Sequence, residues 1–199
     1  DTTMDTNGEL ALRLGVETSL EGWLFPDTYY YVKGDSELAL FQLALSKMHS
    51  VLKENWQGQS ADSVLASPYA ALTLASIIEK ETGYEPDRAM IASVFHNRLA
   101  DGMRLQSDPT VIYGLGEQFT GDLKQSHLRT DSSHNTYTRH GLPLTPICSP
   151  GLASIQAATT YTRSPYLYFV AKGDGESHFS TTLDEHNQAV DRYQRGISR

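Results

Sequence analysis

Three stretches of the chain repeat apolar residues at the three- and four-residue spacing of an amphipathic helix. They cover residues 35–56, residues 69–82 and residues 85 to about 101. The pair Ser67-Pro68 is typical of an N-cap and a first helical position, and Gly83 ends the second stretch. The pattern predicts three helices, and we expect the second and third to pack against each other as a hairpin.

Shorter elements follow in the C-terminal third of the chain. Residues 151–160 have the pattern of a short helix, and residues 166–170 that of a strand. The glycine-rich turn at residues 173–175 leads to a second strand at residues 178–180, and a closing helix begins near Thr182. Helices in the middle and a hairpin near the end predict an α+β fold.

Two stretches lack helical periodicity. Residues 1–34 are rich in turn formers and aromatic residues, so they are predicted as short strands or an extended strip and not as helix. A helical turn begins at Asp108-Pro109 and reaches Tyr113, after which residues 114–150 are dominated by Gly, Thr, Ser, Asn, His and Pro. Such a long irregular stretch inside a compact domain is usually functional.

Length, charge and cysteine content narrow the classes of function. The 199 residues fit one large domain, or one domain with a small appendage. A net charge of −8, with 16 scattered Lys and Arg residues, argues against nucleic-acid binding, which needs clustered positive charge. The single cysteine, Cys148, has no partner for a disulfide or a zinc site, so it leaves the cellular compartment open.

No part of the sequence approaches the roughly 20 apolar residues of a membrane span. The first residues also lack the basic and then apolar pattern of a signal peptide. We therefore expect a soluble chain. Its abrupt polar beginning is equally compatible with a fragment from which an anchor or leader has been removed.

The most informative residue is Glu81, at the end of the second predicted helix. It shares the apolar face that carries Ile77, whereas Glu79 lies well round the helix. Burial raises the pKa of a carboxyl group, and a protonated acid near neutral pH is what cleavage of a glycosidic bond requires. The pattern fits equally well a Glu81 that reaches solvent or pairs with Arg88 or Arg98.

Polar side chains gather after the third predicted helix. Amide, hydroxyl and phenol groups suit a sugar, whose hydroxyls need polar partners and whose ring faces rest on aromatic rings. We predict substrate contacts at Gln106, Ser107, Asp108 and Tyr113. The segment Ser107-Asp108-Pro109 is also an ordinary helix start. A second cluster of polar and aromatic residues lies at residues 134–138, where Asn and Thr in a loop more often stabilise the turn itself.

Other chemistries lack their motifs. The seven histidines include no HExxH, and His134 with His140 has no acidic residue at a supporting spacing, so no metal is expected. Nucleotide binding is not expected either, because the glycine-rich residues 114–116 do not follow a βαβ pattern and lack the lysine of a P-loop. A GxSxG nucleophile motif is absent too, and no cofactor is expected.

Taken together, the motifs resemble the YceG/MltG family of endolytic murein transglycosylases, from about Leu20 to near the C-terminus. The resemblance rests on EGWLFPDT (21–28), ASIIEKET (75–82), ASVFHNRL (92–99), MRLQSDPTVIYG (103–114), NTYT (135–138), GLP (141–143) and PYLYFV (165–170). It implies a helical, lysozyme-like catalytic core with Glu81 as the catalytic residue. It also implies that Gln106 lines the sugar cleft and that Asn135 and Tyr137 form a loop opposite the acid.

The same resemblance implies an organisation and a location. Residues 1–34 would be a remnant of a LysM-like subdomain, and residues 35–199 the catalytic domain. The protein would lie at the periplasmic side of the bacterial inner membrane, held by an anchor that is not part of this chain. Glycan strands of peptidoglycan would be its substrate, and peptidoglycan synthases and division proteins its partners.

The implied reaction cleaves the β-1,4 bond between N-acetylmuramic acid and N-acetylglucosamine. Glu81 protonates the leaving oxygen and then takes the proton of the muramoyl 6-hydroxyl, which closes a 1,6-anhydro ring and terminates or trims the strand. Because no water is activated, one carboxylate suffices. Two alternatives stay open: a hydrolytic muramidase with Asp108 as its second carboxylate, and a non-catalytic module that binds peptidoglycan or acts as a divisome scaffold.

Overall fold

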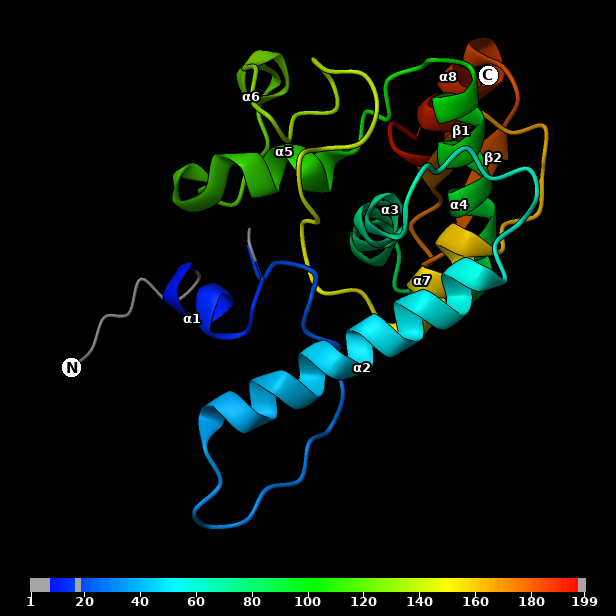
Figure 1. The fold of residues 1–199 in the computed structure, drawn as a ribbon. Coiled ribbons are helices and arrows are strands. Elements are labelled where there is room, and N and C mark those ends of the chain that lie inside the picture. The colour runs from blue at the N-terminus through cyan, green and yellow to red at the C-terminus, as the bar shows by residue number, and fades with distance from the viewer. Residues whose placement is uncertain (1–7, 17–18, 197–199) are drawn as a thin grey trace.

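A computed structural model describes residues 8–16 and 19–196 of the chain, which form helices and one small antiparallel sheet (Figure 1). The helices are α1 (Gly8–Arg13), α2 (Glu37–Gln57), α3 (Pro68–Glu81), α4 (Glu85–Ala100), α5 (Asp108–Leu115), α6 (Gln125–Arg129), α7 (Leu152–Thr159) and α8 (Leu183–Tyr193), with a short 3-10 turn at Gly116–Gln118. The strands are β1 (Tyr168–Ala171) and β2 (Ser177–Ser180). This combination confirms the predicted α+β fold class.

Helix α3 is the centre of the core. The Ser67 hydroxyl accepts a hydrogen bond from the backbone N–H of Ala70 at 3.1 Å, so the helix is capped where the sequence predicts its start. Every residue from Ala71 to Ile78 is buried. Figure 1 views α3 nearly along its axis, with α2, α4, α5 and α7 around it. The last residue of α3, Glu81, therefore stands on a helix that is packed on all sides.

Helices α2 and α7 pack against α3, and α2 crosses it (Figure 1). The predicted apolar face of α2 is confirmed at Leu45, Met48 and Leu52, which are buried, whereas Leu43 is 54% exposed. Residues Ile155 and Ala158 of α7 are fully buried. Helix α7 also contacts α4, and His96 of α4 hydrogen-bonds the carbonyl of Ala158 at 2.8 Å. Helix α7 thereby joins α3 and α4.

The predicted hairpin of α3 and α4 takes a different form. The two helices are in contact, but Figure 1 shows α3 nearly end-on and α4 lengthwise, so they cross instead of running antiparallel. Helix α7, which is distant in sequence, packs on both of them and takes the place that an antiparallel partner would have. Apolar periodicity predicts each buried face, but it does not specify which helix covers that face.

The N-terminal strip departs from the prediction in one place. The sequence predicts no helix in residues 1–34, yet α1 lies there. This short helix forms because one of its faces is covered, as the 1% exposure of Ala11 shows. Residues 19–34 contain turns but neither helix nor strand, so they form an extended strip without the predicted short strands. Residues 1–7 and 17–18 lie outside the described residues.

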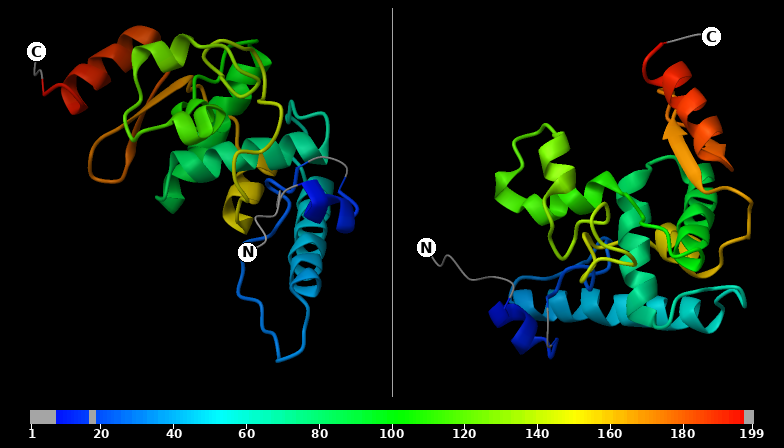
Figure 2. Two further views of the ribbon diagram at one scale, coloured as in Figure 1. Left: turned by 90° about the vertical axis from the view of Figure 1, so that its left-hand side faces the viewer. Right: turned by 90° about the horizontal axis from the view of Figure 1, so that it is seen from above.

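The extended strip packs on the core and on the long irregular stretch. Phe25 is 8% exposed and belongs to the same buried cluster as the residues of α3. Gly22 adopts a positive φ of 84°, and a Cβ atom there would lie 2.5 Å from the Cβ of Pro146. Only glycine fits such a close approach. Views from two further directions show this strip beside α2 (Figure 2).

A β-hairpin and α8 complete the fold near the C-terminus. Strands β1 and β2 pair in antiparallel register with Phe169 opposite Phe179, close to the predicted strands. The turn between them uses Gly173 and Gly175 at positive φ values of 95° and 97°. Helix α8 is capped by Thr182, whose hydroxyl accepts a hydrogen bond from the backbone N–H of Glu185 at 3.2 Å.

No helix within residues 8–16 and 19–196 has the length and hydropathy that a membrane crossing requires.

Candidate active site around Glu81

Glu81 is held by a single short hydrogen bond at the C-terminal end of α3. The hydroxyl of Ser107, which precedes α5, donates to Oε1 of Glu81 at 2.5 Å. The pKa of Glu81 is raised to about 7: burial is the largest cause and the charge of Asp108 acts in the same direction, whereas the Ser107 hydrogen bond and the charge of Arg98 lower it. The negative end of the α3 dipole also disfavours a carboxylate at this position. Glu81 is therefore protonated in a large share of molecules near neutral pH.

A buried network of hydroxyl groups fixes Ser107. Ser107 is 2% exposed, and its backbone N–H donates to Oγ1 of Thr136 at 3.0 Å. The hydroxyl of Thr110 donates to the carbonyl of Ser107 at 2.6 Å and lies 2.8 Å from the hydroxyl of Thr136. Such a satisfied buried network holds its members in one arrangement. The Ser107 hydroxyl is therefore oriented toward the acid, whereas the sequence predicts that it contacts the substrate.

Thr110 and Thr136 are site residues that the sequence does not single out. Both are buried, with exposures of 0% and 2%. Each lies within a motif that carries the family resemblance, but a threonine in a loop or at a helix start has an ordinary local use. Nothing in their spacing shows that their hydroxyl groups meet across the fold.

Gln106 lies beside the acid in an unusual backbone conformation. Among the described residues, it is the one residue other than glycine with a positive φ, at 52°. Its backbone N–H donates to the carbonyl of Thr136 at 3.2 Å, which holds this conformation, and its side chain is exposed. A residue in this region carries a cost of about 1–3 kcal/mol, and such residues cluster at functional sites. The exposed amide is available for a ligand, in keeping with the predicted role of Gln106.

Tyr137 and Asp108 form the other side of the site. The hydroxyl of Tyr137 donates to Oδ1 of Asp108 at 2.5 Å. Burial raises the pKa of Tyr137 strongly, and the negative charges of Asp108 and Glu81 act in the same direction. Tyr137 therefore keeps its proton and remains a hydrogen-bond donor. One oxygen of the exposed Asp108 carboxylate is bound to this phenol.

Asn135 has a structural role that differs from the predicted sugar contact. It is 1% exposed, and its amide nitrogen donates to the carbonyls of Thr130, Leu128 and His127 at 2.7, 3.2 and 3.3 Å. Its amide oxygen accepts a hydrogen bond from the backbone N–H of Tyr137 at 2.8 Å. The amide is saturated by the protein, so we assign Asn135 to holding the loop after α6 and placing Tyr137.

Tyr113, the remaining predicted contact, points toward the N-terminal strip. Its hydroxyl donates to Oε2 of Glu21 at 3.4 Å, and its ring lies 4.8 Å from the ring of His134. No hydrogen bond within the described residues links it to Glu81 or Ser107. The structure thus brings Gln106, Ser107, Asp108 and Tyr137 together with Glu81 and leaves Tyr113 and Asn135 to other contacts.

The alternative in which Glu81 pairs with an arginine does not match the geometry. Arg98 is 7% exposed, and its guanidinium donates to the carbonyls of Leu167 at 2.7 Å and of Leu105 at 2.8 Å. Neither Arg98 nor Arg88 forms an ion pair with Glu81 in the part of the chain that the structure describes. Arg98 therefore lowers the pKa of Glu81 through its charge. It also holds the backbone of Leu105, the residue before Gln106.

The neighbouring Glu79 is used by the fold. Its Oε2 accepts hydrogen bonds from the hydroxyl of Ser154 at 2.6 Å and from the backbone N–H of Gly151 at 3.2 Å. These groups lie at the start of α7, where unpaired backbone N–H groups favour a carboxylate. Glu79 thereby ties α3 to α7, and it is not a second acid of the site.

Among the residues described, no group of three His, Cys, Asp or Glu side chains is placed to hold a metal ion.

Comparisons with known proteins show which family the chain resembles. Residues 2–192 match the YceG-like family. The endolytic murein transglycosylase of Bacillus subtilis is 40% identical over 178 residues, which are 89% of this chain and 49% of that protein. The protein of the same name from Streptococcus pneumoniae is 32% identical over 181 residues, which are 88% of this chain and 32% of that protein.

A solved structure extends the similarity to the fold. The crystal structure of a YceG-like protein from Listeria monocytogenes aligns with a TM-score of 0.75 and 35% sequence identity. The alignment covers 93% of this chain and 64% of that chain. The chain spans about half the length of the Bacillus relative and about a third of the Streptococcus relative. With a family match over nearly its whole length, the chain belongs to the YceG-like family.

Proposed function

We propose that this chain is the catalytic part of an endolytic murein transglycosylase, with Glu81 as its acid and base. The observation that carries the proposal is a partly buried carboxyl group with a pKa of about 7, held by Ser107 at the end of the central helix. Such a group is matched to proton transfer in both directions near neutral pH. The names of the Bacillus and Streptococcus relatives support murein as the substrate.

The proposed reaction uses one carboxyl group twice, first as an acid and then as a base. The hydroxyl of Ser107 donates to Oε1 of Glu81, so the proton of the neutral acid resides on Oε2. That proton passes to the glycosidic oxygen as the bond to the anomeric carbon of the muramoyl residue breaks. The resulting carboxylate then accepts the proton of the muramoyl 6-hydroxyl, whose oxygen bonds to the anomeric carbon and closes a 1,6-anhydro ring. Glu81 ends the cycle protonated, and no water is consumed.

Two neighbours support this cycle. The charge of Asp108 raises the pKa of Glu81, and Tyr137 holds the Asp108 carboxylate in place. We assign substrate contacts to the exposed amide of Gln106 and to the half-buried Tyr137. With murein as the substrate, the chain would act in the bacterial cell envelope. The periplasmic face of the inner membrane, an anchor outside this chain, and contacts with peptidoglycan synthases and division proteins are finer parts of the same proposal.

The two alternatives fit the site less well. In a hydrolytic muramidase, the second carboxylate would activate a water molecule or form a covalent intermediate. Asp108 already accepts a short hydrogen bond from Tyr137, and this bond weakens it as a base or nucleophile. A module that only binds glycan has no need for a carboxyl group with a raised pKa, which costs folding stability.

Digestion of purified sacculi at a series of pH values tests the proposal. We expect the chain to release soluble fragments, with activity highest below about pH 7, because Glu81 must begin the cycle protonated. Above its pKa the activity should fall about tenfold per pH unit. Binding of sacculi without release of fragments would support a scaffold instead. An activity that stays flat to pH 9, with folding shown to be constant, would contradict Glu81 as the general acid.

A further inference from the structure

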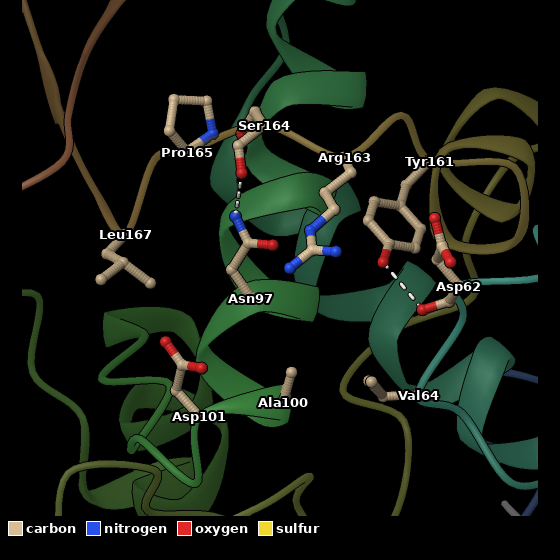
Figure 3. A pocket seen from close by; sticks show the side chains of 10 residues that line it. All are labelled: Asp62, Val64, Asn97, Ala100, Asp101, Tyr161, Arg163, Ser164, Pro165 and Leu167. Carbon is tan, nitrogen blue, oxygen red and sulfur yellow. Dashed lines mark hydrogen bonds between the residues drawn. The ribbon is translucent and has the colours of Figure 1, made fainter.

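A pocket of about 630 Å³ lies at the C-terminal end of α4, outside the hydrogen-bonded cluster around Glu81 (Figure 3). Three segments line it: the last turn of α4, the connection from α7 to β1, and the loop between α2 and α3. Sites for small ligands typically measure about 300–1,000 Å³. The pocket is therefore large enough for a short peptide or a molecule of similar size.

The walls of the pocket are held in place by hydrogen bonds. The amide nitrogen of Asn97 donates to the carbonyls of Ser164 and Tyr166, each at 2.8 Å. The hydroxyl of Tyr161 donates to the carbonyl of Asp62 at 2.8 Å, which joins the two loops, and Tyr161 is itself 7% exposed. A site that is already formed before binding loses little entropy when it takes a ligand.

Both signs of charge face the pocket. The guanidinium of Arg163 extends over it between Asn97 and Tyr161, and the carboxylate of Asp101 rises from the opposite wall (Figure 3). Arg163, Asp101 and Asp62 are exposed, and none of them forms an ion pair within residues 8–16 and 19–196. A cation and two anions without ion-pair partners complement a ligand that carries a carboxylate and an ammonium group. A neutral sugar would not require this combination.

One buried side chain, Arg98, contacts both the wall of the pocket and the segment that leads to Ser107. Arg98 directly follows Asn97, and its Nε donates to the carbonyl of Leu167, a residue of the pocket wall, at 2.7 Å. Its Nη1 donates to the carbonyl of Leu105 at 2.8 Å, immediately before Gln106 and Ser107. The two regions therefore share α4 as a common wall.

We propose that this pocket binds a short zwitterionic peptide of the kind that murein carries on its muramoyl groups. Arg163 would bind a carboxylate of the peptide and Asp101 an ammonium group. The proposal rests on the proposed function for the source of the peptide, because the pocket's charges specify only a zwitterionic ligand. It adds recognition of the peptide to an enzyme that cleaves the sugar chain.

The test uses the charge reversal Arg163→Glu and two forms of one substrate. Glycan strands with their peptides are compared with the same strands after an amidase has removed the peptides. Arg192→Glu, at an exposed position of α8, is the matched control. We expect Arg163→Glu to lower the cleavage of peptide-bearing strands about tenfold, the effect of losing one charge-assisted hydrogen bond, and to leave the stripped strands unaffected. The Arg192→Glu variant should match the wild type on both substrates.

A binding measurement separates this proposal from the proposed function. The peptides released by the amidase are titrated into the isotope-labelled chain, and we expect shifts in the amide resonances of residues 161–167 that disappear in Arg163→Glu. If the wild type cleaves neither form of the strands and these shifts are nevertheless seen, the proposed function fails and the pocket assignment stands. An equal loss on both substrates, or no binding of the peptide that depends on Arg163, would overturn the pocket assignment. The latter result would favour a protein partner at this surface.

Discussion

Replacing Glu81 by Gln should reduce the cleavage of glycan strands by at least about a thousandfold, because an amide of the same shape cannot deliver a proton. The variant should fold, since the Gln carbonyl oxygen can still accept the hydrogen bond from Ser107. Release of soluble fragments from sacculi measures the rate. The control is Glu79→Gln, at a residue of the same helix whose carboxylate caps α7. That variant should keep its activity within about twofold and lose on the order of 1 kcal/mol of stability.

The same variant has an expected effect on stability. In the unfolded chain Glu81 ionises near its ordinary pKa of 4.5, whereas in the folded chain it does so near 7. Between these two values the unfolded state binds fewer protons, so the wild type loses stability as the pH rises from 4.5 to 7 and changes little above 7. Glu81→Gln should avoid this loss and be more stable than the wild type at pH 8, by on the order of 1–3 kcal/mol. Chemical unfolding of both proteins at pH 4 and pH 8 measures the difference, and an inactive variant that is less stable at both pH values would point to a structural Glu81.

Replacing Asn135 by Ala should give the largest loss of stability among single changes at the site. Its amide nitrogen serves three carbonyls, and its oxygen holds the backbone of Tyr137. Loss of these part-buried hydrogen bonds costs about 3 kcal/mol in total. Chemical unfolding of the variant measures this loss, and Asn187→Ala, at an exposed position of α8, is the control.

The activity of the Asn135→Ala variant distinguishes two roles for the residue. If Asn135 organises the loop, the rate should fall together with the stability, because Tyr137 loses its position. A variant with an unchanged free energy of unfolding and a greatly reduced rate would instead indicate direct contact with the substrate.

The sequence predicts those parts of the fold and site that depend on local patterns. Periodicity places the core helices correctly, and the same periodicity puts Glu81 on a buried face, which is the physical origin of its raised pKa. The Ser-Asp-Pro segment is the predicted helix start, since Ser107 precedes α5, and the Ser107 hydroxyl contacts the candidate acid.

Features that depend on contacts between distant segments could not be predicted in this way. The sequence allows Arg98 to pair with Glu81, but the guanidinium is held by backbone carbonyls of two other segments. The sequence predicts Asn135 as a sugar contact, but in the structure its side-chain amide binds backbone groups of its own loop. The crossing of α3 and α4 depends on α7, and the pocket beside Arg163 forms only where three separate segments meet.

The mass of the new strand ends tests the central claim most directly. Sacculi are digested with the chain, and the soluble fragments are analysed by mass spectrometry before any chemical reduction. If the Glu81 carboxylate accepts the proton of the muramoyl 6-hydroxyl, the new muramoyl ends carry a 1,6-anhydro ring and each fragment is one water lighter than its hydrolytic counterpart. Fragments with free reducing ends, heavier by that water, would show that water is the nucleophile and would contradict the account.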